Sequence, residues 1–96
     1  MAVYLISDVI VHDNDAVEKY RELAADSIEK WGGRYLVRGG AINVLEGDRH
    51  PTTLIVVEFP SKRIAEEWYR SSDYAKALEF RHDALSRSLI LVEGLE

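Results

Sequence analysis

Residues 52–59, TTLIVVEF, contain the strongest strand signal in the sequence. They are rich in β-branched residues and end at Pro60, which cannot donate to a ladder of backbone hydrogen bonds. The central LIVV, residues 54–57, is apolar at both alternating sets of positions. Because successive side chains of a strand point to opposite faces of a sheet, this segment predicts a strand that is covered on both faces.

The segments on either side switch between the two-residue period of strands and the 3.6-residue period of helices. Strands are predicted at residues 2–11, 34–38 and 86–92, with an extended continuation at 41–45, and helices at 13–31 and 61–81, the second interrupted at Ser71 and Ser72. The order β, α, β, β, α, β predicts an α+β, ferredoxin-like βαββαβ fold, with a four-stranded antiparallel sheet and both helices on one face. A chain of 96 residues is expected to form a single domain, 1–96.

The sheet face without helices is predicted to be apolar as well, because residues 54–57 and 89–92 are apolar at both parities. An exposed patch of this size favours association. A second copy of the same sheet is the simplest cover, so the sequence predicts a homodimer formed through the open face.

Composition and charge exclude several kinds of partner. The net charge of -5 and the absence of a basic stripe argue against nucleic acid. No run approaches the roughly 20 apolar residues of a membrane helix, and the N-terminus lacks a basic segment typical of a signal peptide. Cysteine is absent, which excludes disulfides and thiolate metal sites and fits a cytoplasmic protein.

Motifs for cofactors and common catalytic machinery are also missing. The histidines, His12, His50 and His82, have no HxH or HExxH spacing, so no metal is expected. GxSxG, GxGxxG and the P-loop pattern are absent, and no cofactor is expected.

The stretch GGRYLVRGG, residues 32–40, combines two pairs of glycines with two arginines. The first pair is predicted to end the preceding helix. The pair at 39–40 either forms a β-bulge or lets backbone amides approach a ligand. Simple alternation places Arg34, Leu36 and Arg38 on one face of the strand and the two residues between them on the other.

Arg38 is predicted to be partly buried beside the glycines. A buried guanidinium needs a carboxylate or an anionic ligand. Glu58 is the first internal candidate and Glu46 the next, so one interpretation is a purely structural ion pair between Arg38 and Glu58. Glu58 is also the best candidate for a catalytic base.

The segment WYRSSDY, residues 68–74, predicts a second wall of a cleft. Trp68 is expected in the core, whereas the helix break presents hydroxyls and free amides, with Ser72 as a possible cap of the next helix. Arg81 either closes the site or pairs with an acid such as Glu58. The predicted ligand-binding set is Arg38, Gly39, Glu58, Tyr69, Ser72, Tyr74 and Arg81, suited to a small carboxylate or a polar aromatic compound.

The combination of GGRYLVRGG, EFPS at 58–61, WYRSSDY, Arg81 and LILVEG at 89–94 resembles the domain-of-unknown-function family 1330, within the dimeric α/β-barrel superfamily. The resemblance covers essentially the whole chain. It implies a homodimer with facing sheets, in mainly bacterial cytoplasmic proteins, and no established activity. Other members of the superfamily include cofactor-free monooxygenases, lactone isomerases, haem-degrading enzymes and chlorite-dismutase-like proteins, so fold alone does not decide the chemistry.

Two functions therefore remain open at the level of sequence. One is a small-molecule-binding dimer, with cofactor-free isomerase or monooxygenase chemistry as its enzymatic form. The other is a non-catalytic accessory or stress module in which Arg38, Glu58 and Arg81 satisfy one another and leave no cavity.

Overall fold

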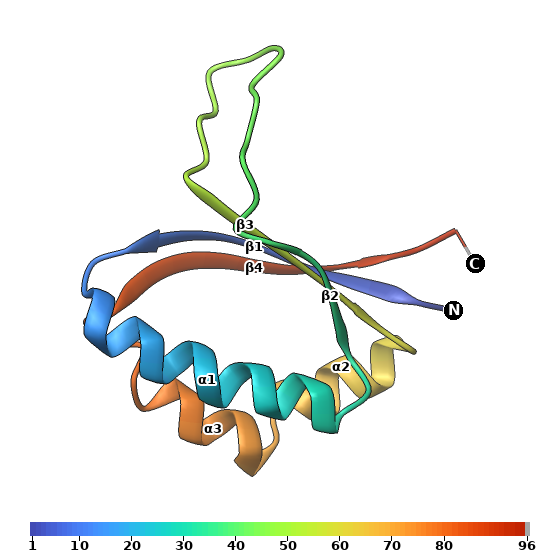
Figure 1. Ribbon diagram of the computed structural model, residues 1–96. Coiled ribbons are helices and arrows are strands. Elements are labelled where there is room, and N and C mark those ends of the chain that lie inside the picture. The colour runs from blue at the N-terminus through green and yellow to red at the C-terminus, as the bar shows by residue number, and fades with distance from the viewer. Residues whose placement is uncertain (96) are drawn as a thin grey trace.

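The predicted order of strands and helices is present in the computed structural model, which describes residues 1–95. Its elements are β1 (Val3–Val11), α1 (Asn14–Lys30), β2 (Arg34–Arg38), β3 (Thr53–Phe59), α2 (Lys62–Tyr69), α3 (Ser72–Leu78) and β4 (Leu85–Glu93). The sheet is antiparallel with strand order β2-β3-β1-β4, and the helices lie together on one side of it (Figure 1). This confirms the ferredoxin-like arrangement.

Side-chain caps begin the three helices. Asp13 Oδ1 accepts hydrogen bonds from the backbone N–H groups of Asp15 and Ala16, at 3.0 and 3.1 Å, and starts α1. The cap of α3 is Ser71, whose Oγ accepts from the N–H of Tyr74 at 3.1 Å. The prediction that Ser72 caps this helix is therefore wrong by one residue, since Ser72 is the first residue of α3.

The core lies between the helices and the odd-numbered residues of β1, β3 and β4. In β1 the burial alternates strictly, with Val3, Leu5, Ser7 and Val9 buried. Trp68 is 1% exposed, and its Nε1–H donates to Ser27 Oγ at 2.9 Å, so α2 and α1 are joined by a hydrogen bond within the core. The even-numbered residues face the side of the sheet that carries no helix.

A β-bulge in β2 changes the direction of its side chains. Tyr35 pairs with Val57 and Val37 pairs with Val56, so Leu36 is an extra residue in this ladder. As a result, Tyr35 and Arg38 share the helix-covered face. Simple alternation, which placed them on opposite faces, is wrong here.

The residues after β2 form a long loop instead of a continued strand. Gly39 has a φ of +73° and turns the chain away from the sheet, so the predicted bulge lies before the glycine pair, not at it. Residues 41–45, expected to continue the extended chain, are exposed and lie outside any strand. The loop projects on the side of the sheet opposite the helices (Figure 1).

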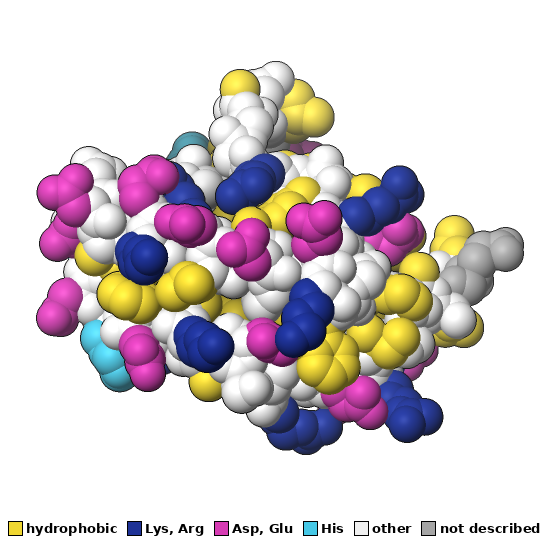
Figure 2. All heavy atoms as spheres, turned by 60° about the horizontal axis from the view of Figure 1, so that its bottom comes forward, with side chains coloured by type: hydrophobic (Ala, Val, Ile, Leu, Met, Phe, Trp, Pro, Cys, Tyr) yellow, Lys and Arg dark blue, Asp and Glu magenta, His cyan; other side chains and the backbone are white. Residues whose placement is uncertain are grey.

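The helix-covered surface is electrostatically mixed. Figure 2 shows acidic and basic side chains interspersed over this face, with no continuous basic area among the described residues in view. Within residues 1–95, no helix is long and apolar enough to cross a bilayer. The same part of the chain contains no group of three or more His, Asp or Glu residues able to hold a metal ion.

Substitution of Gly33 tests the packing between α1 and the sheet. A Cβ at this position would lie 2.8 Å from Ile28 Cγ2 and 2.8 Å from Phe59 Cε1, both side chains of the core. We expect Gly33→Ala to lower the free energy of unfolding by about 1–3 kcal/mol through overpacking. Gly40→Ala is the matched control, because a Cβ there meets nothing within 4 Å. Equal urea-unfolding midpoints for the two variants would contradict this packing.

Candidate functional site

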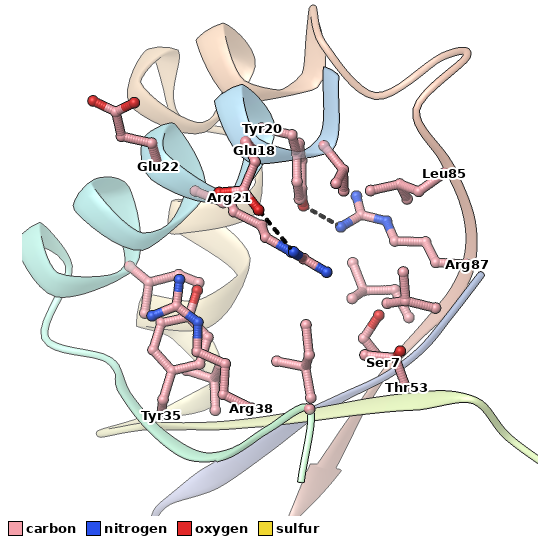
Figure 3. A pocket seen from close by; sticks show the side chains of 18 of the residues that line it. Ser7, Glu18, Tyr20, Arg21, Glu22, Tyr35, Arg38, Thr53, Leu85 and Arg87 are labelled. Carbon is pink, nitrogen blue, oxygen red and sulfur yellow. Dashed lines mark hydrogen bonds and ion pairs between the residues drawn. The ribbon is translucent and has the colours of Figure 1, made fainter. Parts of the chain in front are cut away.

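A cavity of about 950 Å³ separates α1 from the helix-covered face of the sheet (Figure 3). This volume lies within the range of roughly 300–1,000 Å³ that is typical of small-molecule sites. The sheet supplies a mainly apolar floor with two hydroxyls, formed by Leu5, Ser7, Val9, Thr53, Ile55, Val57, Leu85 and Leu89. The opposite wall is α1, which contributes Val17, Tyr20, Arg21, Ala24 and Ile28.

Arg87 places a positive charge in this apolar setting. It lies on β4 and shares the helix-covered face with Leu85 and Leu89, which belong to the floor. Its Nη1–H donates to the hydroxyl of Tyr20, as Figure 3 shows. Its guanidinium carbon lies 5.4 Å from the ring centroid of Tyr20 and 5.7 Å from that of Tyr74. The position is one where a cation is stabilised by two aromatic rings.

Tyr20 and Tyr74 complete what we call the Arg87 cluster: Arg87, Tyr20 and Tyr74. The two hydroxyl oxygens are 2.6 Å apart, and both side chains are buried, at 8% and 0% exposure. The cluster thus joins β4, α1 and α3 by hydrogen bonds at one end of the cavity.

The protonation states of the cluster follow from burial and from its mutual contacts. Burial raises the pKa of Tyr74 far above its usual value, and the neighbouring Tyr20 adds to this shift. Burial disfavours the charge of Arg87, but the oxygens of Tyr20 and Tyr74 outweigh this effect, so its pKa is raised. Near neutral pH the cluster therefore contains a neutral Tyr74 and a charged Arg87.

A second arginine lies on the opposite edge strand. The guanidinium carbon of Arg38 is 4.5 Å from the ring centroid of Tyr35, and both residues line the cavity. Burial raises the pKa of Tyr35, although the charge of Arg38 acts in the other direction. Within residues 1–95, neither Arg38 nor Arg87 forms a salt bridge.

The remaining charges of the cavity come from α1. Arg21 points into the middle of the cavity in Figure 3, and its Nη1 lies 3.2 Å from Glu18 Oε1. Asp15, Glu18 and Glu22 are exposed and belong to the rim, and Lys19 lies beside them. The sheet contributes no acidic side chain to the described lining.

The sequence-predicted site residues are brought together only in part. Arg38 and Gly39 line the cavity, and Tyr74 reaches it through Tyr20. The predicted ion pair between Arg38 and Glu58 is wrong, because Glu58 lies on the open face of the sheet. There Glu58 Oε1 is 2.8 Å from Arg34 Nε and its other oxygen accepts from the Tyr4 hydroxyl at 3.4 Å.

Three other predicted residues lie outside the cavity lining. Tyr69 is half exposed and borders a smaller hollow of about 320 Å³ between α2 and β4. Ser72 is exposed at the start of α3, which is seven residues long. Arg81 follows α3, and its buried Nε has no hydrogen-bond partner among the described residues. The expected pairing of Arg81 with Glu58 is not formed within residues 1–95.

Tyr20, Arg21, Tyr35 and Arg87 line the cavity but were not predicted from the sequence as site residues. Tyr20 has the spacing of the apolar stripe of α1, and the hydrophobic period does not show that a stripe residue carries a hydroxyl. Arg87 did carry a signal, since it has the parity of the buried Leu85 and the partly buried Leu89 in the last strand. A cation at such a position needs a partner, and this one has tyrosines.

Replacement of Tyr74 tests the electrostatics of the cluster. The folded state favours neutral Tyr74, so its contribution to stability is present below the unfolded pKa of 10.0 and is lost as pH rises above it. We expect Tyr74→Phe to show a smaller loss of unfolding free energy between about pH 8 and about pH 10.5 than the wild type, measured by urea unfolding. Removal of the hydrogen bond should also cost about 1 kcal/mol at both pH values. Identical pH dependence in the two proteins would contradict the assignment.

Solved structures with this fold have low sequence identity to this chain. A protein of unknown function from Rhodopseudomonas palustris superimposes with a TM-score of 0.81 at 21% identity, over 99% of this chain and 83% of that one. A provisionally assigned antibiotic biosynthesis monooxygenase from Nitrosomonas europaea gives a TM-score of 0.59 at 15% identity, over 98% of this chain and 90% of that one. At these identities the likeness shows the fold alone.

A third solved structure with this fold is described as dimeric. This ferredoxin-like protein of unknown function from Thermobifida fusca matches with a TM-score of 0.55 at 16% identity, over 95% of this chain and 89% of that one.

The sequence comparisons identify the family of this chain. The sequence has no significant match among curated proteins. Residues 2–95 match the family model described as a domain of unknown function, DUF1330. As its sequence motifs predicted, the chain belongs to the DUF1330 family.

Proposed function

We propose that this chain binds a small organic anion with an aromatic or unsaturated body in the cavity between α1 and the sheet. The observation that carries the proposal is Arg87, a partly buried guanidinium that faces the cavity and forms no salt bridge within residues 1–95. A charge in such a setting is costly unless an opposite charge or several hydrogen bonds compensate it. An anionic ligand would supply both.

The chemistry of Arg87 matches a planar anion. A guanidinium has five N–H donors in a fixed fork that fits a carboxylate. Within residues 1–95, Nη1 donates to the Tyr20 hydroxyl and the Tyr74 hydroxyl lies beside the guanidinium, so most of the fork remains available to a ligand. Because the cation-π contacts hold the group in place, a ligand would not need to immobilise it. The apolar floor would bury the hydrocarbon part of the same ligand.

The same arrangement suits reactions that pass through an enolate or a phenolate. Fixed donors in a site with little water stabilise negative charge as it develops on a substrate oxygen. We therefore extend the proposal to cofactor-free isomerase or monooxygenase chemistry on such an anion, with Arg87 as the oxyanion-stabilising group. Glu58 is given no part in it, because its carboxylate lies on the other face of the sheet.

The non-catalytic alternative depends on an internal network of Arg38, Glu58 and Arg81. Within residues 1–95 these three side chains do not pair with one another, and a cavity remains. The geometry therefore favours the binding function over the purely structural interpretation.

Calorimetric titration with benzoate and with its neutral isostere benzamide tests the binding function. We expect benzoate to bind the wild type. Arg87→Met, which keeps an unbranched side chain, should bind benzoate at least tenfold more weakly, since hydrogen bonds to charged groups contribute about 1.5–3 kcal/mol. Arg63→Met is the matched control, because Arg63 is exposed on α2 and pairs with Glu67. Equal affinity for benzamide, or unchanged benzoate binding by Arg87→Met, would contradict the proposal.

We further propose that the chain forms a homodimer through the open face of the sheet. Apolar residues on this face include Ile10 and Ile90, both 54% exposed, and Val92 at 43%. Facing sheets would bury this patch, as the dimeric state of the Thermobifida fusca neighbour also suggests.

A charge on the open face tests this assembly. We expect the wild type to have twice the chain mass in light scattering and Ile90→Asp to have the mass of one chain, because the carboxylate would lose its water in the interface. The side chain of Ile90 is largely exposed in the single chain, so the fold of the variant should be kept. Ala75→Asp, on an exposed position of α3, should remain a dimer. A dimeric Ile90→Asp variant would contradict the assignment of the interface.

A further inference from the structure

The two arginines of the cavity that form no salt bridge within residues 1–95 lie on opposite edge strands of the sheet. On the basis of the binding function proposed above, we infer that the ligand of this cavity is a dianion. It is an aromatic or unsaturated dicarboxylate whose two acidic groups lie at opposite ends of a rigid apolar body. Arg87 holds one end, and Arg38 holds the other.

The strand register determines the separation of the backbone positions of the two arginines. Arg87 pairs with Val9 of β1, and Val9 pairs with Thr53 of β3. Arg38 pairs with Ile55 of β3, and Ile55 follows Thr53 as the next residue on the same face of that strand. The two arginines thus sit three strand spacings apart, roughly 14 Å across the sheet, and are further offset by two residues along the strands. Only the bulge in β2 brings Arg38 to this face.

Each guanidinium is held at its own end of the cavity. Arg87 is tied to Tyr20 and lies beside Tyr74, whereas Arg38 lies over the ring of Tyr35. The floor between them is formed by Val9, Ile55 and two hydroxyl residues. A ligand with one acidic group would leave one of the two cations without a counterion. Because the arginines come from opposite edge strands, a flat ring with acids at opposite positions matches their arrangement better than a dianion with adjacent acids.

The other charged groups of the cavity do not supply the missing counterions. The acids of the lining, Asp15, Glu18 and Glu22, are exposed on α1, and Glu18 is already paired with Arg21. Arg21 points into the centre of the cavity and is the competing candidate for the second acid of the ligand (Figure 3). Arg38 is exposed, so its contribution is reduced by solvent and should be smaller than that of Arg87.

Three ligands of the same ring size separate the dianion inference from the binding function itself. Terephthalate carries two carboxylates at opposite positions, 4-carbamoylbenzoate replaces one of them by a neutral amide, and benzoate has only one. Isothermal titration of the wild type should show terephthalate binding about tenfold more tightly than 4-carbamoylbenzoate, between the effect of an exposed ion pair and that of a charged hydrogen bond. In Arg38→Gln this difference should disappear.

The controls use other arginines of the chain. Arg63→Gln should keep the tenfold difference, because Arg63 is exposed on α2 away from the cavity lining. Arg21→Gln should also keep it, whereas loss of the difference in Arg21→Gln and not in Arg38→Gln would overturn the assignment of the second group. Circular dichroism melting of each variant checks that the fold is kept; Arg38 is exposed, so its replacement should leave the melting temperature nearly unchanged.

Different titration results would contradict the dianion inference and the binding function. If benzoate and 4-carbamoylbenzoate bind and terephthalate binds no better, the dianion inference is overturned and the binding function stands. If none of the three ligands binds to the folded wild type, the proposed function fails and the inference fails with it.

Discussion

The Arg87 cluster, in which Arg87 donates to the Tyr20 hydroxyl and this hydroxyl is hydrogen-bonded to that of Tyr74, organises the half of the molecule that contains the cavity. It joins β4, α1 and α3 at one end of the cavity and keeps a cation on a mainly apolar floor. Hydroxyl partners leave the guanidinium its full charge, which a carboxylate partner would have neutralised. The Arg87 cluster therefore combines a structural role with a cation that forms no salt bridge within residues 1–95, and the proposed function rests on that cation.

The fold could be predicted because it depends on local patterns that can be recognised in the sequence. The two parities of residues 54–57, the helical period of 13–31 and the proline after Phe59 determine which segments are strands and helices. The helix starts at Asp13 and Ser61 follow from simple capping chemistry. These features are local, so each one can be recognised without knowing its neighbours in space.

The site could be predicted only in part, because it depends on how strands are paired. Arg38 was predicted as a site residue and does line the cavity, but one extra residue at Leu36 places it on the other face and away from Glu58. Nothing in the residues RYLVR distinguishes a bulged strand from a regular one. Arg87 and Tyr20 are 67 positions apart and form a pair only because β4 lies beside β1 beneath α1. Fold likeness does not supply the chemistry either, since this architecture hosts unrelated reactions.

The most direct test of the central claim is an NMR titration of the arginine Nε–Hε groups and backbone amides with benzoate. We expect the largest shifts at Arg87 Nε–Hε, at Tyr20 on α1 and at the floor residues of the cavity, because the carboxylate would occupy the donors that face them. Shifts confined to the open face of the sheet or to the loop after Gly39 would show that the anion binds elsewhere. That result would contradict the assignment of the cavity as the functional site.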